Sequence, residues 1–141
     1  MKNVSKLVVR MGLLSLLSVM PLTAQIVNGV DFTTSFPFYV GNAKMPAGSY
    51  KITQSDMDAN ILQVQSNDGV HSALVEFIPT RSAQPHPHSD VTFHKYGETE
   101  YLNRIWIEGQ EYGMKVDPTK AELKAAANAN VVEHSLSASL P

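Results

Sequence analysis

The chain contains no cysteine among its 141 residues. Disulfide bonds, thiolate nucleophiles and cysteine-ligated zinc or iron–sulfur sites are therefore excluded. Charged residues are also scarce, at 17% of the chain, which excludes a disordered tail and a coiled coil because both are rich in charge. Hydrophobic residues make up 43%, enough for a core, and the length suits about one domain. Without disulfides, that core must supply nearly all of the stability.

Acidic residues are missing from the first 30 positions. All thirteen lie at Asp31 or beyond, whereas Lys2, Lys6 and Arg10 are three of the eleven basic residues. The chain after residue 24 therefore carries a net charge of −5 when histidine is neutral. A body this acidic lacks the basic footprint that nucleic acids and anionic membranes require.

A long hydrophobic run is also absent. The apolar stretch 11–20 is about half of the roughly 20 residues that a membrane-spanning helix needs. It follows the three basic residues and is ended by Pro21, and small Ala24 precedes Gln25. This order predicts a secretory signal peptide over residues 1–24, although the bulk of Leu22 leaves a different cleavage position open. The mature protein, residues 25–141, is then expected to be a single domain in the periplasm or the extracellular space, and to lack a membrane span.

Alternation of apolar and polar residues dominates the rest of the chain and predicts an all-β fold. Strands are expected at 32–40, 50–54, 61–65, 70–79, 91–96, 101–108 and 111–116, with a further candidate at 131–136. A short helix is expected to begin near Pro118, because Thr119 and Glu122 have the spacing of a capping box. The expected architecture is one antiparallel β-sandwich or small barrel of about seven to eight strands, with that helix near the C-terminus.

The core is predicted from the apolar face of each strand. Its expected members are Phe32, Phe36, Phe38, Ile52, Val64, Val75, Phe77, Phe93 and Trp106. Trp106 shares a strand face with Arg104, so one end of that face is expected to be wet. Pro37 cannot donate to a ladder, which predicts an edge strand near the start of the mature chain. Such an edge offers a route to a protein partner or to self-association, although Pro37 would blunt it.

A histidine cluster offers a metal-binding hypothesis. His86, His88, Asp90 and His94 are side chains of the kind that hold zinc or copper. Prolines at 85 and 87 instead favour a polar loop with solvated imidazoles. The pair resembles the His-x-His of cupins, yet no glutamate follows until Glu98, and the Pro-x-Gly of those barrels occurs here before the histidines instead of after them.

Catalytic patterns are weak. No Gly-x-Ser-x-Gly elbow and no glycine-rich phosphate loop occur. The acid pairs Glu98/Glu100 and Asp56/Asp58 fall in expected turns, where solvated carboxylates are usual. The sequence therefore favours a non-enzymatic protein with no catalytic residue and no cofactor.

Aromatic residues offer a binding hypothesis instead. Seven residues could form a ligand or partner surface, or could simply pack the core: Phe36, Phe38, Tyr39, Tyr96, Tyr101, Trp106 and Tyr112. A barrel that holds a small apolar ligand between its sheets is a further alternative.

Several segments together resemble a family of uncharacterised small exported β-rich proteins of acidobacteria. They are FPFYVGN at 36–42, MPAGSY at 45–50, VTFHKYG at 91–97, YLNRIW at 101–106 and the short helix at 120–124. Met45 and Lys95 stand where leucine and arginine are expected. The resemblance covers roughly residues 31–127 and implies export and one β-rich domain, but no substrate or cofactor. The combined expectation is an exported, non-enzymatic binding or structural module.

Overall fold

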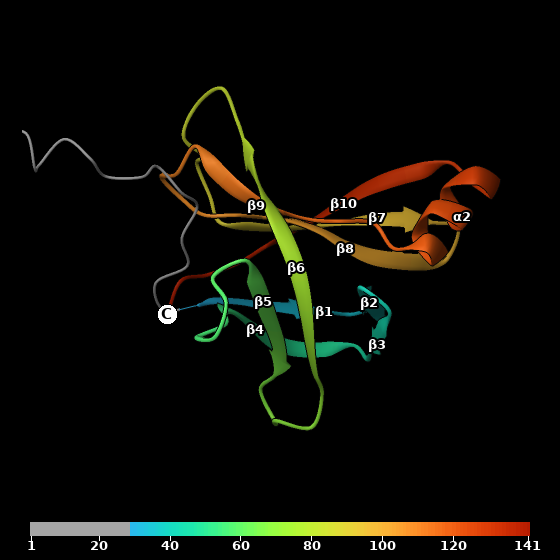
Figure 1. Ribbon diagram of the computed structural model, residues 1–141, viewed down its shortest axis with the longest axis horizontal. Helices are drawn as coiled ribbons and strands as arrows, with labels where there is room; N and C mark the ends of the chain where they lie inside the picture. Colours follow the sequence, from blue (N-terminus) through green and yellow to red (C-terminus); the bar gives the residue numbers. More distant parts are fainter. Residues whose placement is uncertain (1–28) are drawn as a thin grey trace, which may run out of the picture.

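The computed structural model describes residues 29–141 (Figure 1). The expected signal peptide lies outside the described residues. Within 29–141, no helix is both long enough and apolar enough to cross a membrane.

The described chain folds into ten strands and one short helix, which confirms the all-β prediction. The elements are β1 (Val30–Thr34), β2 (Phe38–Val40), β3 (Ala43–Met45), β4 (Gly48–Gln54), β5 (Ile61–Ser66), β6 (Ser72–Arg81), β7 (Asp90–Tyr96), β8 (Thr99–Trp106), β9 (Tyr112–Val116), α2 (Lys120–Asn128) and β10 (Val131–Ser137). There are more strands than expected because the stretch 32–40 divides at Ser35–Pro37 into β1 and β2, and because 43–45 pairs back on β2.

Strand β6 carries the chain from one layer to the other. Its first half pairs with β5 and its second half with β9, so β1, β4 and β5 form one layer and β7, β8, β9 and β10 form the other. Figure 1 shows β6 crossing between them and α2 lying at the end of the second layer. Nearly all pairings are antiparallel, as predicted. The exception is β2, which meets β8 in parallel at Tyr39 and Tyr101, so the sheet is mixed.

The sheet is not closed into a barrel. Strands β1 and β10 are joined only by a bridge just beyond β10, where Asp31 and Ser139 exchange backbone hydrogen bonds of 2.8 and 2.9 Å. The C-terminus therefore lies beside the start of β1 (Figure 1). We refer to this junction as the seam.

Aromatic rings fill the space between the layers. Phe32 lies 5.6 Å from Tyr50, 5.9 Å from Phe38 and 6.1 Å from Phe93, measured between ring centroids. Most of the predicted core is confirmed: Phe32, Phe38, Ile52, Val64, Phe77 and Phe93 are buried in one cluster, with Phe36 and Val75 packed against it. Trp106 is buried as predicted, at 9% exposed, but it lies on the opposite face of its strand and outside this cluster.

Helix α2 begins as its sequence predicts. The Thr119 hydroxyl accepts a hydrogen bond from the Glu122 backbone N–H at 3.1 Å, which is half of a capping box. The other half does not form, because the Glu122 side chain turns to the sheet and accepts a hydrogen bond from the Tyr96 hydroxyl at 3.0 Å.

Candidate functional site

A β-bulge decides which side chains of β8 share a face. Phe93 pairs with Leu102 and Thr92 with Arg104, so Asn103 is the extra residue. The bulge places Tyr101, Arg104 and Trp106 on the face turned away from the core. We call this the outer face; it also carries the even-numbered residues of β7, together with Gly113 and Lys115 of β9.

Three tyrosines cluster at one end of the outer face. Tyr39 stacks on Tyr101 at 5.2 Å, and Tyr96 meets Tyr101 edge-on at 5.9 Å. Glu122 closes the cluster from α2, with His94 Nδ1 3.8 Å from its carboxylate. Burial, together with the nearby Glu122, raises the pKa of Tyr96 to about 12, and burial also raises the pKa of Tyr101. The pKa of Glu122 is raised too, chiefly by burial, against the lowering influence of the Tyr96 hydrogen bond and of the nearby His94 and Lys115 side chains.

Trp106 lies at the other end of the outer face, where it contacts the His86 ring and the backbone at Gly113. His86 stacks on it at 4.9 Å with an interplanar angle of 11°, and His86 Nε2 lies 2.8 Å from an Asp90 carboxylate oxygen. Gly113 lies under the indole, where an added Cβ would fall 2.6 Å from the Trp106 ring. The indole is therefore packed against both the His86 ring and the backbone at Gly113.

The four predicted metal-binding residues do not come together in one cluster. His86 and Asp90 pair with each other, His94 faces Glu122, and His88 is exposed on the loop before β7. No group of three or more His, Cys, Asp or Glu residues in the part of the chain that the structure describes could hold a metal ion. Metal binding stays a prediction, which elemental analysis of the purified protein would test.

The seven predicted surface aromatics do not form one patch. Phe38 is 1% exposed and belongs to the core, and Phe36 packs on Phe93 and on His134, because both side chains point between the layers. Tyr112 packs against the core and takes the Arg81 guanidinium over its ring at 5.5 Å. Tyr39, Tyr96, Tyr101 and Trp106 do share the outer face, but the last three are less than 10% exposed.

A buried acid on β8 lies on the inner face. Glu100 is 3% exposed, and its Oε1 lies 2.8 Å from His134 Nδ1 of β10. Its Oε2 is buried without a hydrogen-bond partner among residues 29–141. The sequence pattern placed Glu100 in a solvated turn. This was wrong, because Glu100 pairs with Lys95 across the β7–β8 ladder and shares the inward side of Phe93.

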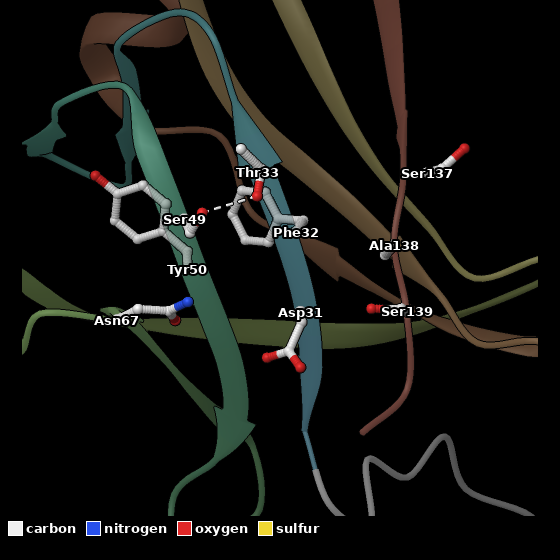
Figure 2. Close-up of a pocket in the computed structure, with 9 residues that line it drawn as sticks. All are labelled: Asp31, Phe32, Thr33, Ser49, Tyr50, Asn67, Ser137, Ala138 and Ser139. Atoms are coloured by element: carbon white, nitrogen blue, oxygen red, sulfur yellow. Dashed lines mark hydrogen bonds between the residues drawn. The ribbon is translucent and has the colours of Figure 1, made fainter.

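A cleft at the seam is a site that sequence reasoning missed. Its volume is about 340 Å³, and it is lined by Asp31, Phe32, Thr33, Ser49, Tyr50, Asn67, Ser137, Ala138 and Ser139. Figure 2 shows Ser139 beside Asp31, with the two strands diverging from this point. We call it the seam cleft.

Hydroxyl groups lie along the seam cleft. The Thr33 and Ser49 hydroxyls hydrogen-bond each other at 2.8 Å across β1 and β4 (Figure 2). The Asp31 carboxylate lies 3.8 Å from Lys51 Nζ. Serines and threonines on strands are common, and nothing in the sequence shows that residues near 31 and near 139 meet.

A smaller cleft of about 280 Å³ shares Ser49, Tyr50 and Asn67 with the seam cleft. Its outer wall is the turn after β5, where Asp68 accepts hydrogen bonds from the Ser66 hydroxyl and the Val70 N–H. The hydrogen bond from Ser66 and that from Val70 lower the pKa of Asp68, so this wall carries a carboxylate at neutral pH.

These features define an all-β domain with an open seam and a polar cleft beside it. Comparisons with protein-family models, with curated proteins and with solved structures found no match to the chain.

Proposed function

We propose that the protein is an exported, non-enzymatic β-domain that binds a small hydroxyl-rich ligand, of the carbohydrate class, in the seam cleft. The observation that carries this proposal is the lining of the cleft. Its volume of about 340 Å³ falls in the range of small-molecule sites. Hydroxyl, carboxamide and carboxylate groups line it and supply both donors and acceptors.

The chemistry of the lining suits a sugar. Asp31 accepts hydrogen bonds from paired hydroxyls, Asn67 both donates and accepts, and the hydroxyls of Thr33 and Ser49 retain spare capacity beyond their mutual bond. Phe32 and Tyr50, stacked at 5.6 Å, also border the cleft, but they are 4% and 1% exposed, so contacts to a ligand come from the polar groups.

The absence of an assembled nucleophile supports a non-enzymatic role. The two closest histidine–carboxylate pairs are His86–Asp90 and His134–Glu100. Among residues 29–141, no serine or threonine hydroxyl is hydrogen-bonded to either histidine. Neither pair therefore forms the chain of contacts that activates a hydroxyl.

Ligand binding is tested by saturation-transfer NMR on the mature protein with glucose, galactose, N-acetylglucosamine and cellobiose. We expect transfer to at least one sugar, lost in Ser49→Ala because that substitution removes a hydroxyl from the cleft. Ser72→Ala, an exposed serine outside the cleft, is the matched control and should bind normally. Transfer to none of the sugars, or equal transfer in both variants, would refute the proposal.

Export is proposed from the leader sequence alone. In a bacterial host that secretes through the same signals, the full chain should appear in the periplasm or medium with Gln25 as its first residue. Mass spectrometry of the purified protein measures this directly. An intact leader on a cytoplasmic protein would contradict it.

A further inference from the structure

Two basic side chains lie directly opposite each other on the outer face. Arg104 of β8 pairs with Lys115 of β9. The next pair along, Ile105 with Met114, is fully buried, so Arg104 and Lys115 both point away from the core. Like charges opposite each other on neighbouring strands destabilise a sheet. Folding alone therefore does not favour this pairing.

Neither cation has a close counter-ion in the described chain. No carboxylate of residues 29–141 lies within 4.0 Å of Arg104 or Lys115. Glu122 is the acidic residue that interacts electrostatically with Lys115, but at a distance longer than an ion pair. Glu122 is already engaged by the Tyr96 hydroxyl and faces His94. It therefore does not neutralise the pair.

The guanidinium group of Arg104 is partly buried, but one of its nitrogen atoms has no hydrogen-bond partner in the described chain. Its Nε is buried and has no hydrogen-bond partner among the described residues. Buried nitrogens are nearly always paired, so an unpaired one indicates a missing partner. Nε is the only nitrogen of this side chain that is buried and unpartnered, and the residue is half-buried, so the terminal nitrogens remain accessible.

We infer that Arg104 and Lys115 form a binding site for an oxyanion, a group such as a phosphate, a sulfate or a carboxylate. The planar guanidinium presents two donors to two oxygens of such a group, and the ammonium supplies a second charge. One bound anion removes the repulsion between the cations and accepts hydrogen bonds from the accessible terminal nitrogens of Arg104 and from Lys115 Nζ. This site lies on the outer face, and its residues do not line the seam cleft, so it stands whether or not a sugar binds there.

The test follows the Arg104 Nε–H signal by NMR while sodium phosphate, sodium sulfate or sodium galacturonate is added to the mature protein at constant ionic strength. We expect a saturable shift of this signal with at least one anion. Arg104→Gln and Lys115→Gln should abolish or weaken binding, which backbone amide signals of β8 and β9 report in both variants. Arg81→Gln is the matched control, because Arg81 is exposed and already paired with Glu111 at 3.2 Å.

The three anions separate the sources of the group. A shift with phosphate or sulfate alone indicates a phosphoryl or sulfuryl ligand, and a shift with galacturonate alone indicates an acidic sugar. In the absence of any anion, Lys115→Gln should raise the melting temperature, because it removes the repulsion between the positive charges of Lys115 and Arg104. A linear, unsaturable response to all three anions that Arg104→Gln leaves unchanged would overturn the inference.

Discussion

Single contacts on the outer face decide the position of the one tryptophan in the chain. Trp106 packs against Gly113 and stacks on the His86 ring. Glycine is required at 113 because of this close approach and not because of an unusual backbone angle. The indole therefore serves as the link between β8, β9 and the loop before β7.

Replacing Gly113 by alanine should displace the indole. The new Cβ would lie 2.6 Å from Trp106 Cε3 and 2.8 Å from the Ile105 carbonyl oxygen, so either the ring or the strand must move. Overpacking of this kind costs about 1–3 kcal/mol. Urea unfolding measures this loss, and the fluorescence of the single tryptophan should shift to the red as the ring becomes exposed. Gln84→Ala, in an exposed loop, should change neither quantity; an unchanged emission maximum in Gly113→Ala would contradict the prediction.

Glu122 should make the protein less stable as the pH rises. Burial raises the pKa of its carboxyl group above the usual 4.5, so the folded state binds the proton more tightly than the unfolded state. The stability gained from protonation is full below pH 4.5, and it is lost as the pH rises through the folded-state pKa.

Glu122→Gln should remove this dependence while keeping an acceptor for the Tyr96 hydroxyl. Urea unfolding between pH 4 and 7 should show a smaller fall in stability for the variant than for the natural protein. Glu98→Gln, at an exposed position, is the control. A variant that follows the pH dependence of the natural protein would show that Glu122 is not the group responsible.

At the scale of elements, patterns of neighbouring residues were sufficient to predict the strands and the helix. They did not predict how one strand lies against the next. Period-two alternation predicted most strands, and the spacing of Thr119 and Glu122 predicted the helix start. Simple alternation puts Tyr101 and Trp106 on opposite faces of β8. The bulge at Asn103 brings them to the same face, and bulges leave no mark that one sequence reveals.

The candidate sites were also predicted only in part from the sequence. Sequence reasoning singled out His86 with Asp90, which the structure pairs, and Tyr39 with Tyr101, which it stacks. It missed the seam cleft and the Glu100–His134 pair, because each joins segments that are far apart in the chain. The Arg104–Lys115 pair depends on the register between β8 and β9, which composition does not encode.

For the whole molecule, the net charge acts on ligands at long range, whereas the hydrogen bonds at the candidate sites and at the seam act at short range. The chain after residue 24 carries a net charge of −5, which repels anions at a distance. An oxyanion site on the outer face must therefore depend on short-range hydrogen bonds. The contact between the two edges of the open sheet is equally local, because one bridge joins β1 to the chain after β10.

The bridge at the seam should limit how often the two layers separate. Ser139→Pro removes the N–H that donates to the Asp31 carbonyl oxygen at 2.9 Å, and one lost hydrogen bond costs about 1 kcal/mol. Because β1 has a ladder on one side only, we expect its amides to exchange with solvent faster in this variant, whereas amides of β5, paired on both sides, stay protected. Leu140→Pro is the matched control, since the Leu140 side chain is about half exposed and its N–H makes no backbone hydrogen bond. Hydrogen exchange by mass spectrometry compares the two variants. Equal protection of β1 in both would mean that the aromatic contacts between the layers, and not the bridge, hold the seam together.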